Sequence, residues 1–269
     1  MHKDKDIQLS KAGERIQRAL TSGEFSQEGR FRKVFKMLPS EPRCKLCSAP
    51  FEGLGGSFMK LAFNKYPSNY NPHVCNTCFD VIRKEQIGVE TELSFLFADV
   101  RGSTSLAEGM SSVEFSQLIN RFYQATTHVL IHGDAIIDKL IGDEVAAFYH
   151  PSFVGTDHAF KTIQNAKELL RVTGHADKDG PWIPVGVGVH TGRAWIGAVG
   201  SNEQVTDITA LGDSVNVAAR LASQAGPGEI LISEESRKQA DLPPSDMVER
   251  ELDLKGKSEP MKVWVLRIS

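Results

Sequence analysis

The sequence predicts an α+β protein, and three observations lead to this prediction. Short apolar runs typical of buried strands alternate with amphipathic helical segments over roughly the last two thirds of the chain. Four cysteines lie close together near the N-terminus, and none follows them. The 269 residues are 41% hydrophobic and 24% charged, which provides material for a sizeable core and excludes a mostly disordered chain. We therefore expect one large domain, preceded by a small helical and cysteine-rich segment.

The N-terminal segment, residues 1–42, is expected to form two helices. Apolar residues recur on one helical face as far as Leu20, and a second apolar stripe includes Phe35. Gly23 separates the two stripes, and Pro39 ends the second helix.

Residues 43–90 are expected to form a loop-rich metal-binding segment and a linker. The stretches 53–56 and 66–69 have the composition of turns, and residues 81–88 are expected to form a short connecting helix. A segment with so small a core of its own is a reasonable place for a structural metal ion.

The four cysteines form two Cys-x-x-Cys pairs with 27 residues between them, namely Cys44, Cys47, Cys75 and Cys78. In a reducing compartment these thiols are not expected to form disulfides, so they predict four thiolate ligands for one tetrahedral metal. Zn²⁺ is the simplest occupant. An iron–sulfur cluster also takes four thiolates, and a redox-active dithiol pair is a third interpretation. We expect a structural clip without chemistry of its own.

The large domain is expected to span residues 91–269. Its elements, in order, are a strand at 93–98, a helix capped by Ser111 or Ser112, strands at 135–139 and 145–149, a helix at 156–172, a hairpin of strands at 185–191 and 194–199, a helix at 215–225 capped by Asp213 or Ser214, and strands at 230–232 and 263–266. The order β-α-β-β-α-β with additions is that of the ferredoxin-like fold.

Two carboxylates are expected to converge at one edge of this sheet. Asp99 ends the first strand, and Asp143 lies in the turn of the hairpin that the topology places beside it. Carboxylates with few imidazoles nearby suit Mg²⁺ or Mn²⁺, and two such ions would activate an attacking oxygen and stabilise a leaving phosphate. The alternative is that both are ordinary turn aspartates.

A turn follows the first carboxylate and leads into an expected helix start. It contains Gly102, Ser103 and Thr104. Backbone N–H groups at such a place can bind phosphate oxygens.

Five segments resemble motifs of the class III nucleotide cyclases, in the order in which that family carries them. They are FADVRGST (97–104), DKLIGDE (138–144), GVHTG (188–192), LGDSVNVAARL (211–221) and LKGK (254–257). The resemblance covers about residues 91–269. It implies that the ribose 3′-hydroxyl of a nucleoside triphosphate attacks its own α-phosphate, giving a cyclic nucleotide and pyrophosphate.

The resemblance also implies roles for particular residues. Asp99 and Asp143, with the Val100 backbone, would bind two Mg²⁺ or Mn²⁺ ions. Asn216 would orient the ribose and Arg220 would stabilise charge on the α-phosphate. Their i, i+4 spacing puts both on one helix face.

Base selection is expected to rest on Lys139 and Thr209. The lysine ammonium can only donate, which suits adenine N1, and the threonine hydroxyl can accept from the adenine amine. Both residues match family positions that read adenine, so the expected reaction is conversion of ATP to 3′,5′-cyclic AMP. Lys255, with Lys257 as the alternate, resembles the lysine that binds the β- and γ-phosphates. Arg101 is a second cation for pyrophosphate.

The resemblance implies a homodimer with two equivalent sites. One protomer would supply the metal ligands, and the other would supply the base-binding and transition-state residues. A cyclase for GTP or a pyrimidine nucleotide is one alternative. A degenerate cyclase module with a nucleic-acid-binding zinc ribbon is another, using basic residues near the thiolates such as Arg43 and Lys65. The net charge of −3 argues against nucleic-acid binding.

The sequence predicts a cytoplasmic protein without a membrane span. Apolar runs stay short of the roughly 18 residues that a spanning helix needs. The charged N-terminus lacks the apolar stretch of a secretory signal.

Overall fold

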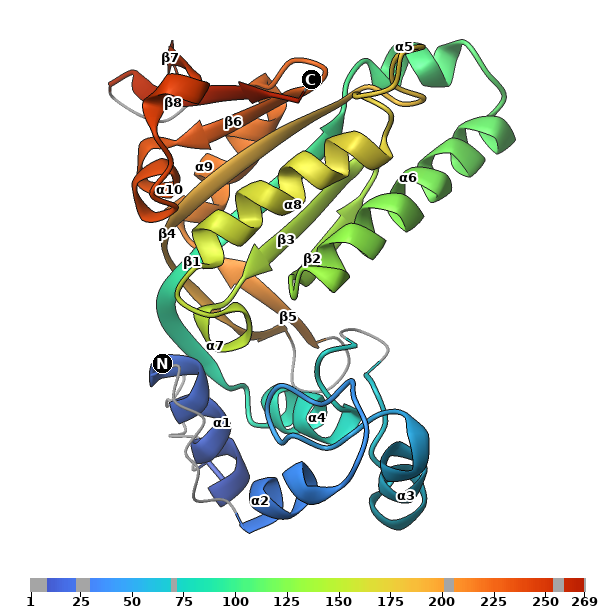
Figure 1. Cartoon of the computed structure of the whole chain (residues 1–269), viewed down its shortest axis with the longest axis vertical. Helices are drawn as coiled ribbons and strands as arrows, with labels where there is room; N and C mark the ends of the chain where they lie inside the picture. The colour runs from blue at the N-terminus through green and yellow to red at the C-terminus, as the bar shows by residue number, and fades with distance from the viewer. Residues whose placement is uncertain (1–8, 23–29, 69–71, 201–205, 254–258, 269) are drawn as a thin grey trace, which may run out of the picture. The chain divides into compact units, whose positions relative to one another are not determined.

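The computed structural model describes residues 9–22, 30–68, 72–200, 206–253 and 259–268 (Figure 1). The chain divides into two compact units. The N-terminal unit comprises residues 1–91 and 195–210, and the C-terminal unit comprises residues 92–194 and 211–269. The three-part division predicted at residues 42 and 90 stays a prediction. Among the helices described, none combines the length and the apolar character needed to cross a membrane.

The described part of the first 90 residues contains four helices. They are α1 (Lys11–Ser22), α2 (Arg30–Met37), α3 (Gly53–Phe63) and α4 (Asn76–Lys84). The two predicted N-terminal helices are thus confirmed, and they bury Leu20 and Phe35 respectively. The start of α1 is fastened to the end of α4, because the Glu85 carboxylate accepts hydrogen bonds from the Ser10 N–H and hydroxyl at 2.9 and 2.6 Å.

Two expectations for the cysteine segment are wrong. The glycine-rich stretch 53–56 is the first turn of α3 and not a loop. A Cβ atom on Gly55 would lie 2.1 Å from the Pro39 carbonyl oxygen, so this glycine serves close packing. The connecting helix begins earlier than predicted, directly after Cys75, and residue 88 already belongs to a strand.

Among the described residues, the sheet has eight strands in the order β2-β3-β1-β4-β6-β8-β7, with β5 paired to β4. The strands are β1 (Gly88–Val100), β2 (Ile136–Ile141), β3 (Glu144–Tyr149), β4 (Val185–Gly200), β5 (Thr206–Leu211), β6 (Glu229–Ser233), β7 (Val248–Leu252) and β8 (Met261–Arg267). β4 and β6 are parallel, and the pairs β1–β3, β2–β3, β6–β8 and β7–β8 are antiparallel. The predicted α+β fold is confirmed.

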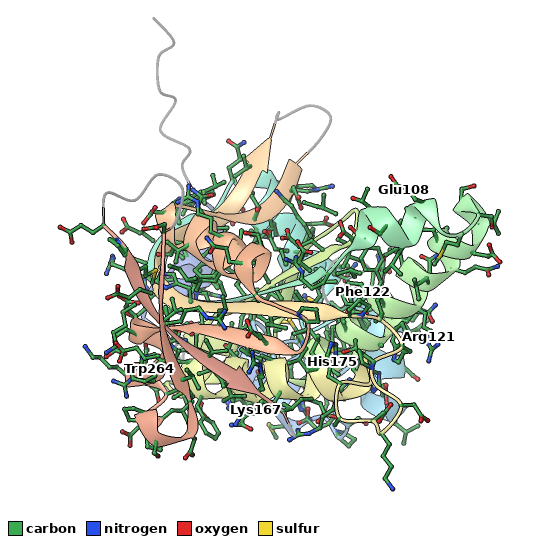
Figure 2. All side chains as sticks on the ribbon, turned by 90° about the horizontal axis from the view of Figure 1, so that it is seen from above. Glu108, Arg121, Phe122, Lys167, His175 and Trp264 are labelled. Carbon is green, nitrogen blue, oxygen red and sulfur yellow. The ribbon has the colours of Figure 1, made fainter. Side chains whose placement is uncertain are left out.

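Helices cover both faces of this sheet. They are α5 (Ser103–Glu108), α6 (Ser112–His132), α7 (Pro151–Val154), α8 (His158–Val172), α9 (Asp213–Gln224) and α10 (Glu234–Gln239), with a 3₁₀ turn at Pro244–Asp246. The views in Figures 1 and 2 place α8 and α9 on opposite faces. Ser111, the first of the two predicted candidates, caps α6 in a capping box with Glu114.

The hairpin predicted around residues 192–193 is wrong. β4 runs unbroken for 16 residues. Its glycines allow α9 to lie directly on the strand: a Cβ on Gly188 would lie 2.3 Å from the Ala222 nitrogen, and one on Gly192 would lie 2.5 Å from the Ser214 hydroxyl. The Ser214 hydroxyl donates to the Arg193 carbonyl at 2.8 Å, and the N-cap of α9 is Gly212 rather than either predicted residue.

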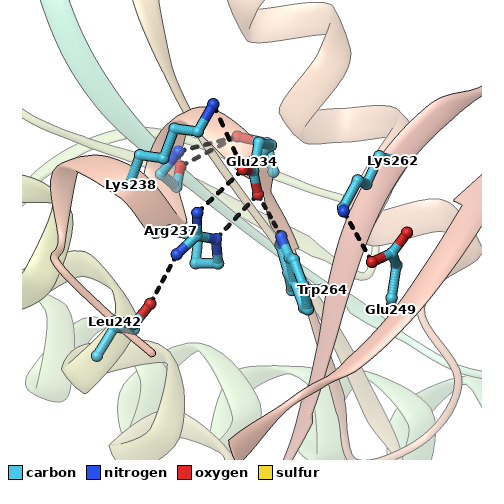
Figure 3. Close-up of polar contacts among 9 residues, drawn as sticks. Glu234, Arg237, Lys238, Leu242, Glu249, Lys262 and Trp264 are labelled. Atoms are coloured by element: carbon cyan, nitrogen blue, oxygen red, sulfur yellow. Dashed lines mark hydrogen bonds and ion pairs between the residues drawn. The ribbon is translucent and has the colours of Figure 1, made fainter. Parts of the chain in front are cut away.

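A charged cluster fixes α10 against β8 (Figure 3). The Glu234 carboxylate accepts hydrogen bonds from the Arg237 guanidinium at 2.9 and 3.0 Å and from the Trp264 indole at 2.5 Å. These bonds, chiefly those from Arg237, lower the pKa of Glu234 to about 2. The carboxylate is therefore ionised at neutral pH and holds the last strand in place.

Candidate active site

Of the two predicted metal carboxylates, Asp99 lies on β1 and Asp143 lies in the turn that precedes β3. Asp99 is the penultimate residue of β1 and is paired in register with Glu144, the first residue of β3. Asp143 directly precedes Glu144, and its carbonyl accepts a hydrogen bond from the Val100 N–H at 3.2 Å. The register therefore brings the two aspartates to the same edge of the sheet.

Glu144 adds a third carboxylate, which sequence reasoning missed. It is half-buried, and burial followed by the charge of Asp143 raises the pKa of its side chain. Its place next to Asp143 is the only sequence signal that could have indicated it. Carboxylate oxygens are the hard donors that Mg²⁺ and Mn²⁺ prefer, so the chemistry of Asp99, Asp143 and Glu144 suits a divalent cation.

Arg101 is a cation close to these carboxylates. Its guanidinium forms an ion pair with the Asp99 carboxylate and donates to the Ser223 carbonyl at 2.7 Å. Burial lowers the pKa of Arg101, and the charges of Asp143 and Glu144 oppose this effect. The arginine is thus engaged within the C-terminal unit.

A hydrogen bond from Tyr123 stabilises the turn that contains Asp143. The Tyr123 hydroxyl, which comes from α6, donates to the Gly142 carbonyl at 2.7 Å. Gly142 has a φ of +61°, a left-handed conformation that favours glycine. Burial, followed by the charge of Asp143, raises the pKa of Tyr123, so the phenol remains a donor at neutral pH.

The stretch predicted to bind phosphate begins a short helix. Gly102, with a φ of +68°, is the N-cap of α5, and Ser103 is the first residue of the helix. Thr104 follows within the same first turn and is exposed. The predicted helix start is present, and its role in binding phosphate stays a prediction.

The outward face of α9 carries Asn216 and Arg220. The opposite face is buried, with Val217 and Leu221 packed in a cluster with residues of β6 and β8. Asn216 is exposed and Arg220 is partly exposed. The apolar side of the helix therefore directs the amide and the guanidinium away from the core.

The remaining predicted substrate residues lie apart in the chain. Lys139 is exposed on β2, in the C-terminal unit. Thr209 is buried on β5, in the N-terminal unit, with 4% of its surface exposed. Lys255 and Lys257 lie outside the described residues.

The four cysteines come together in the N-terminal unit. The sulfur atoms of Cys44, Cys47, Cys75 and Cys78 all lie within 4.8 Å of one another, an arrangement that could hold a metal ion. N–H groups point at the sulfurs: those of Cys47 and Cys75 donate to Cys44 at 3.5 and 3.3 Å, and that of Cys78 donates to Cys75 at 3.4 Å.

Two basic residues near the thiolates have structural partners. The Lys65 ammonium donates to the Cys75 sulfur at 3.6 Å. The Arg43 guanidinium donates to the carbonyls of Phe35 at 2.8 Å and Leu38 at 2.6 Å, at the C-terminal end of α2. These contacts stabilise the unit and weaken the case for a nucleic-acid surface here.

Comparison with known proteins places this architecture in a family. The family profile described as the adenylate and guanylate cyclase catalytic domain matches residues 86–267. The chain belongs to this family. An adenylate cyclase of Anabaena cylindrica is 29% identical over 231 residues, 78% of this chain and 45% of the relative. Adenylate cyclase 1 of Rhizobium meliloti is 30% identical over 135 residues, 48% of this chain and 20% of the relative. The cyclase chain thus spans less than half the length of these relatives.

Solved structures of cyclases share the fold. The adenylyl cyclase CyaB from P. aeruginosa aligns with a TM-score of 0.58 at 26% identity, over 68% of this chain and 96% of that one. The guanylyl cyclase Cya2 aligns with a TM-score of 0.61 at 24% identity, over 66% and 92% of the two chains. Neighbours of both nucleotide specificities are present, so the comparisons support a nucleotide cyclase without distinguishing ATP from GTP.

The Tyr123 hydrogen bond gives a prediction about metal dependence. Tyr123→Phe removes the hydroxyl that holds the Gly142 carbonyl, which is worth about 0.5–1.5 kcal/mol. We expect the divalent metal concentration for half-maximal cyclase activity to rise about threefold to tenfold, with a smaller change in kcat. Tyr66→Phe, in the N-terminal unit, is the control. An unchanged metal dependence at equal folded fraction would show that the turn holds its conformation without Tyr123.

Proposed function

We propose that this cyclase converts ATP to 3′,5′-cyclic AMP and pyrophosphate. The observation that carries the proposal is the pairing of two features in one chain: the carboxylates at the edge of β1 and β3, and the outward amide and guanidinium on α9. Phosphoryl transfer needs both a place for divalent cations and a preorganised positive charge at the reacting phosphate.

Asp99 and Asp143 would hold two Mg²⁺ or Mn²⁺ ions, with the Val100 backbone and the nearby Glu144 contributing oxygen atoms. The ions supply positive charge for the ribose 3′-oxygen and the phosphates. Asn216 orients the ribose by hydrogen bonding, and Arg220 stabilises the negative charge that develops on the α-phosphate. Lys255 and the start of α5 bind the remaining phosphate oxygens.

Lys139 and Thr209 select adenine. The ammonium donates to N1 of the base, a position at which guanine carries its own N–H donor. The threonine hydroxyl accepts from the adenine amine. Threonine can also donate, so the lysine contributes more of the discrimination than the hydroxyl does.

The proposed active enzyme is a homodimer with composite sites. Asp99 and Asp143 of one protomer face Lys139, Thr209, Asn216 and Arg220 of its partner. The exposure of Lys139 and Asn216 supports this arrangement, since both side chains are available to a ligand or a second chain.

A nucleotide panel tests the substrate. With Mn²⁺ or Mg²⁺, we expect cyclic AMP, identified by mass, to form from ATP about ten to one hundred times faster than the cyclic products of GTP, CTP or UTP, because a wrong base leaves a polar group of the site unpaired at a cost of about 1–3 kcal/mol. Asp143→Asn should give none of these products. Lys139→Ala should reduce the ratio of the rate with ATP to the rate with GTP. A product from GTP or a pyrimidine nucleotide at equal or higher rate would replace ATP as the substrate.

Subunit mixing tests the composite site. Asp143→Ala and Asn216→Ala are each expected to be inactive. Mixed one to one with free exchange, they should recover about a quarter of wild-type activity, because half of the dimers then contain one complete site out of two. Mass spectrometry of differently tagged chains establishes that exchange took place. Demonstrated exchange without recovered activity contradicts the composite arrangement.

We further propose that Cys44, Cys47, Cys75 and Cys78 bind one Zn²⁺ as a structural clip. Four sulfurs within 4.8 Å of one another match the tetrahedral thiolate sites that zinc occupies. The cysteines join two parts of the unit, because the first pair precedes α3 and the second pair begins α4. The Lys65 contact and the three N–H···S contacts stabilise negative charge on the sulfurs and so favour the thiolate form, which is the form that binds a metal ion.

Elemental analysis tests the clip. Purified protein should contain about one zinc per chain, and Cys44→Ser should lose the metal and the folded structure of the N-terminal unit, because thiolate sites couple metal binding to folding. Lys65→Met is the matched control, since it removes a charged neighbour but no ligand, and it should retain the zinc. Iron with labile sulfide would indicate a cluster instead. Metal-free reduced protein with a folded N-terminal unit would contradict both the zinc site and the iron–sulfur cluster.

A further inference from the structure

Arg101 connects the edge of the sheet that carries the carboxylates to the end of α9. Its Nη2 atom pairs with the Asp99 carboxylate, and its Nε atom points at the Asp99 carbonyl at 3.4 Å. Its Nη1 atom donates to the carbonyl of Ser223 at 2.7 Å. Ser223 is the second-last residue of α9, where helix carbonyls lack partners within the helix and attract cations.

Both the backbone and the side chain of Arg101 are held in place by neighbouring residues. The Arg101 N–H donates to the Pro184 carbonyl at 2.8 Å, which fixes the backbone from which the side chain extends. The arginine and aspartate side chains are 19% and 22% exposed. An ion pair this sheltered is screened less by salt than a surface pair. A planar guanidinium reaches a carboxylate and a carbonyl at once, which a lysine ammonium does less well.

We propose that Arg101 is the resident counter-ion of Asp99, anchored by α9, and that a divalent cation must displace it from the carboxylate. Arg101 is thus a positioning residue that sets the metal affinity of the site, a role that rests on the proposed metal function of Asp99.

The proposal follows from competition for one carboxylate. The Asp99 oxygen that pairs with Arg101 is a lone-pair donor that a metal ion would use, and a divalent cation beside a guanidinium is repelled by it. Asp143 and Glu144 lie close enough for their charges to act on Arg101. The guanidinium therefore offsets part of the negative charge that attracts metal. The Ser223 carbonyl keeps the guanidinium near the site after displacement.

Direct Mn²⁺ binding tests the proposal without nucleotide or turnover. The full-length protein is titrated with Mn²⁺ alone, and unbound Mn²⁺ is read from its electron paramagnetic resonance spectrum. Arg101→Met removes the charge and both side-chain contacts, and it should bind Mn²⁺ about tenfold more tightly than wild type. Arg101→Lys restores the charge and should return the affinity most of the way to the wild-type value.

Matched variants keep the result specific. Arg171→Met removes one positive charge and one ion pair, with Glu168 at 3.1 Å, elsewhere in the C-terminal unit, and it should leave Mn²⁺ binding unchanged. Asp99→Asn should abolish tight binding. If Arg101→Met does not fold, Arg101→Gln makes the same measurement, since it keeps an amide donor for Ser223 but carries no charge.

The outcomes separate the two proposals. If Asp99→Asn abolishes binding while Arg101→Met binds Mn²⁺ as wild type does or more weakly, the metal site stands and the arginine supports the carboxylate instead of competing for it. If neither wild type nor Arg101→Met binds Mn²⁺, the proposed metal role of Asp99 is wrong, and the proposed competition between Arg101 and the metal ion is wrong as well. Tighter binding by Arg101→Met that Arg101→Lys reverses supports the competition.

Discussion

The close packing of α9 on β4 is the constraint on which the rest of the C-terminal unit depends. It exists because glycines on one face of β4 leave room for the helix backbone, so that even a methyl group at Gly188 would collide with Ala222. The helix is then held by burial of its apolar face, including Leu221, against β6 and β8. Because the apolar face of α9 is buried, its polar face points outward. The outward positions of Asn216 and Arg220 are consequences of strand composition as much as of the helix sequence itself.

The carboxylate edge is fixed by a different interaction, the antiparallel register of β1 and β3. Because Asp99 is opposite Glu144, the tight turn before β3 delivers Asp143 to the same place. Side chains from outside these strands hold the arrangement: Tyr123 on the turn and Arg101 on Asp99. Backbone pairing thus sets which residues meet, and a few polar contacts set how their side chains are oriented. The cysteine site is arranged in the same way: the backbone at the start of α4 positions the sulfurs of Cys75 and Cys78, and the Lys65 side chain adds a polar contact.

Most strands and helices of the C-terminal unit could be predicted from apolar periodicity, and the adjacency of Asp99 and Asp143 followed from their order along the chain. Two of the errors share a physical cause. Glycine at 53–56 and at 192 predicts a turn, whereas in both places the missing side chain permits close packing. A sequence pattern does not distinguish these two uses, since the difference lies in what approaches from elsewhere. The Arg101 contact was beyond sequence reasoning for a related reason: its partner Ser223 is 122 residues away.

The boundaries between the two units fall inside strands. β1 changes unit between residues 91 and 92, and β4 does so between residues 194 and 195. The N-terminal unit is therefore assembled from two segments of the chain, residues 1–91 and residues 195–210. The two segments pack closely: a Cβ on Gly88 would lie 2.1 Å from the ring of Trp195, and the Ala198 N–H donates to the Ile87 carbonyl at 3.2 Å. A chain shortened at residue 91 would keep Trp195 while losing the backbone on which its ring packs.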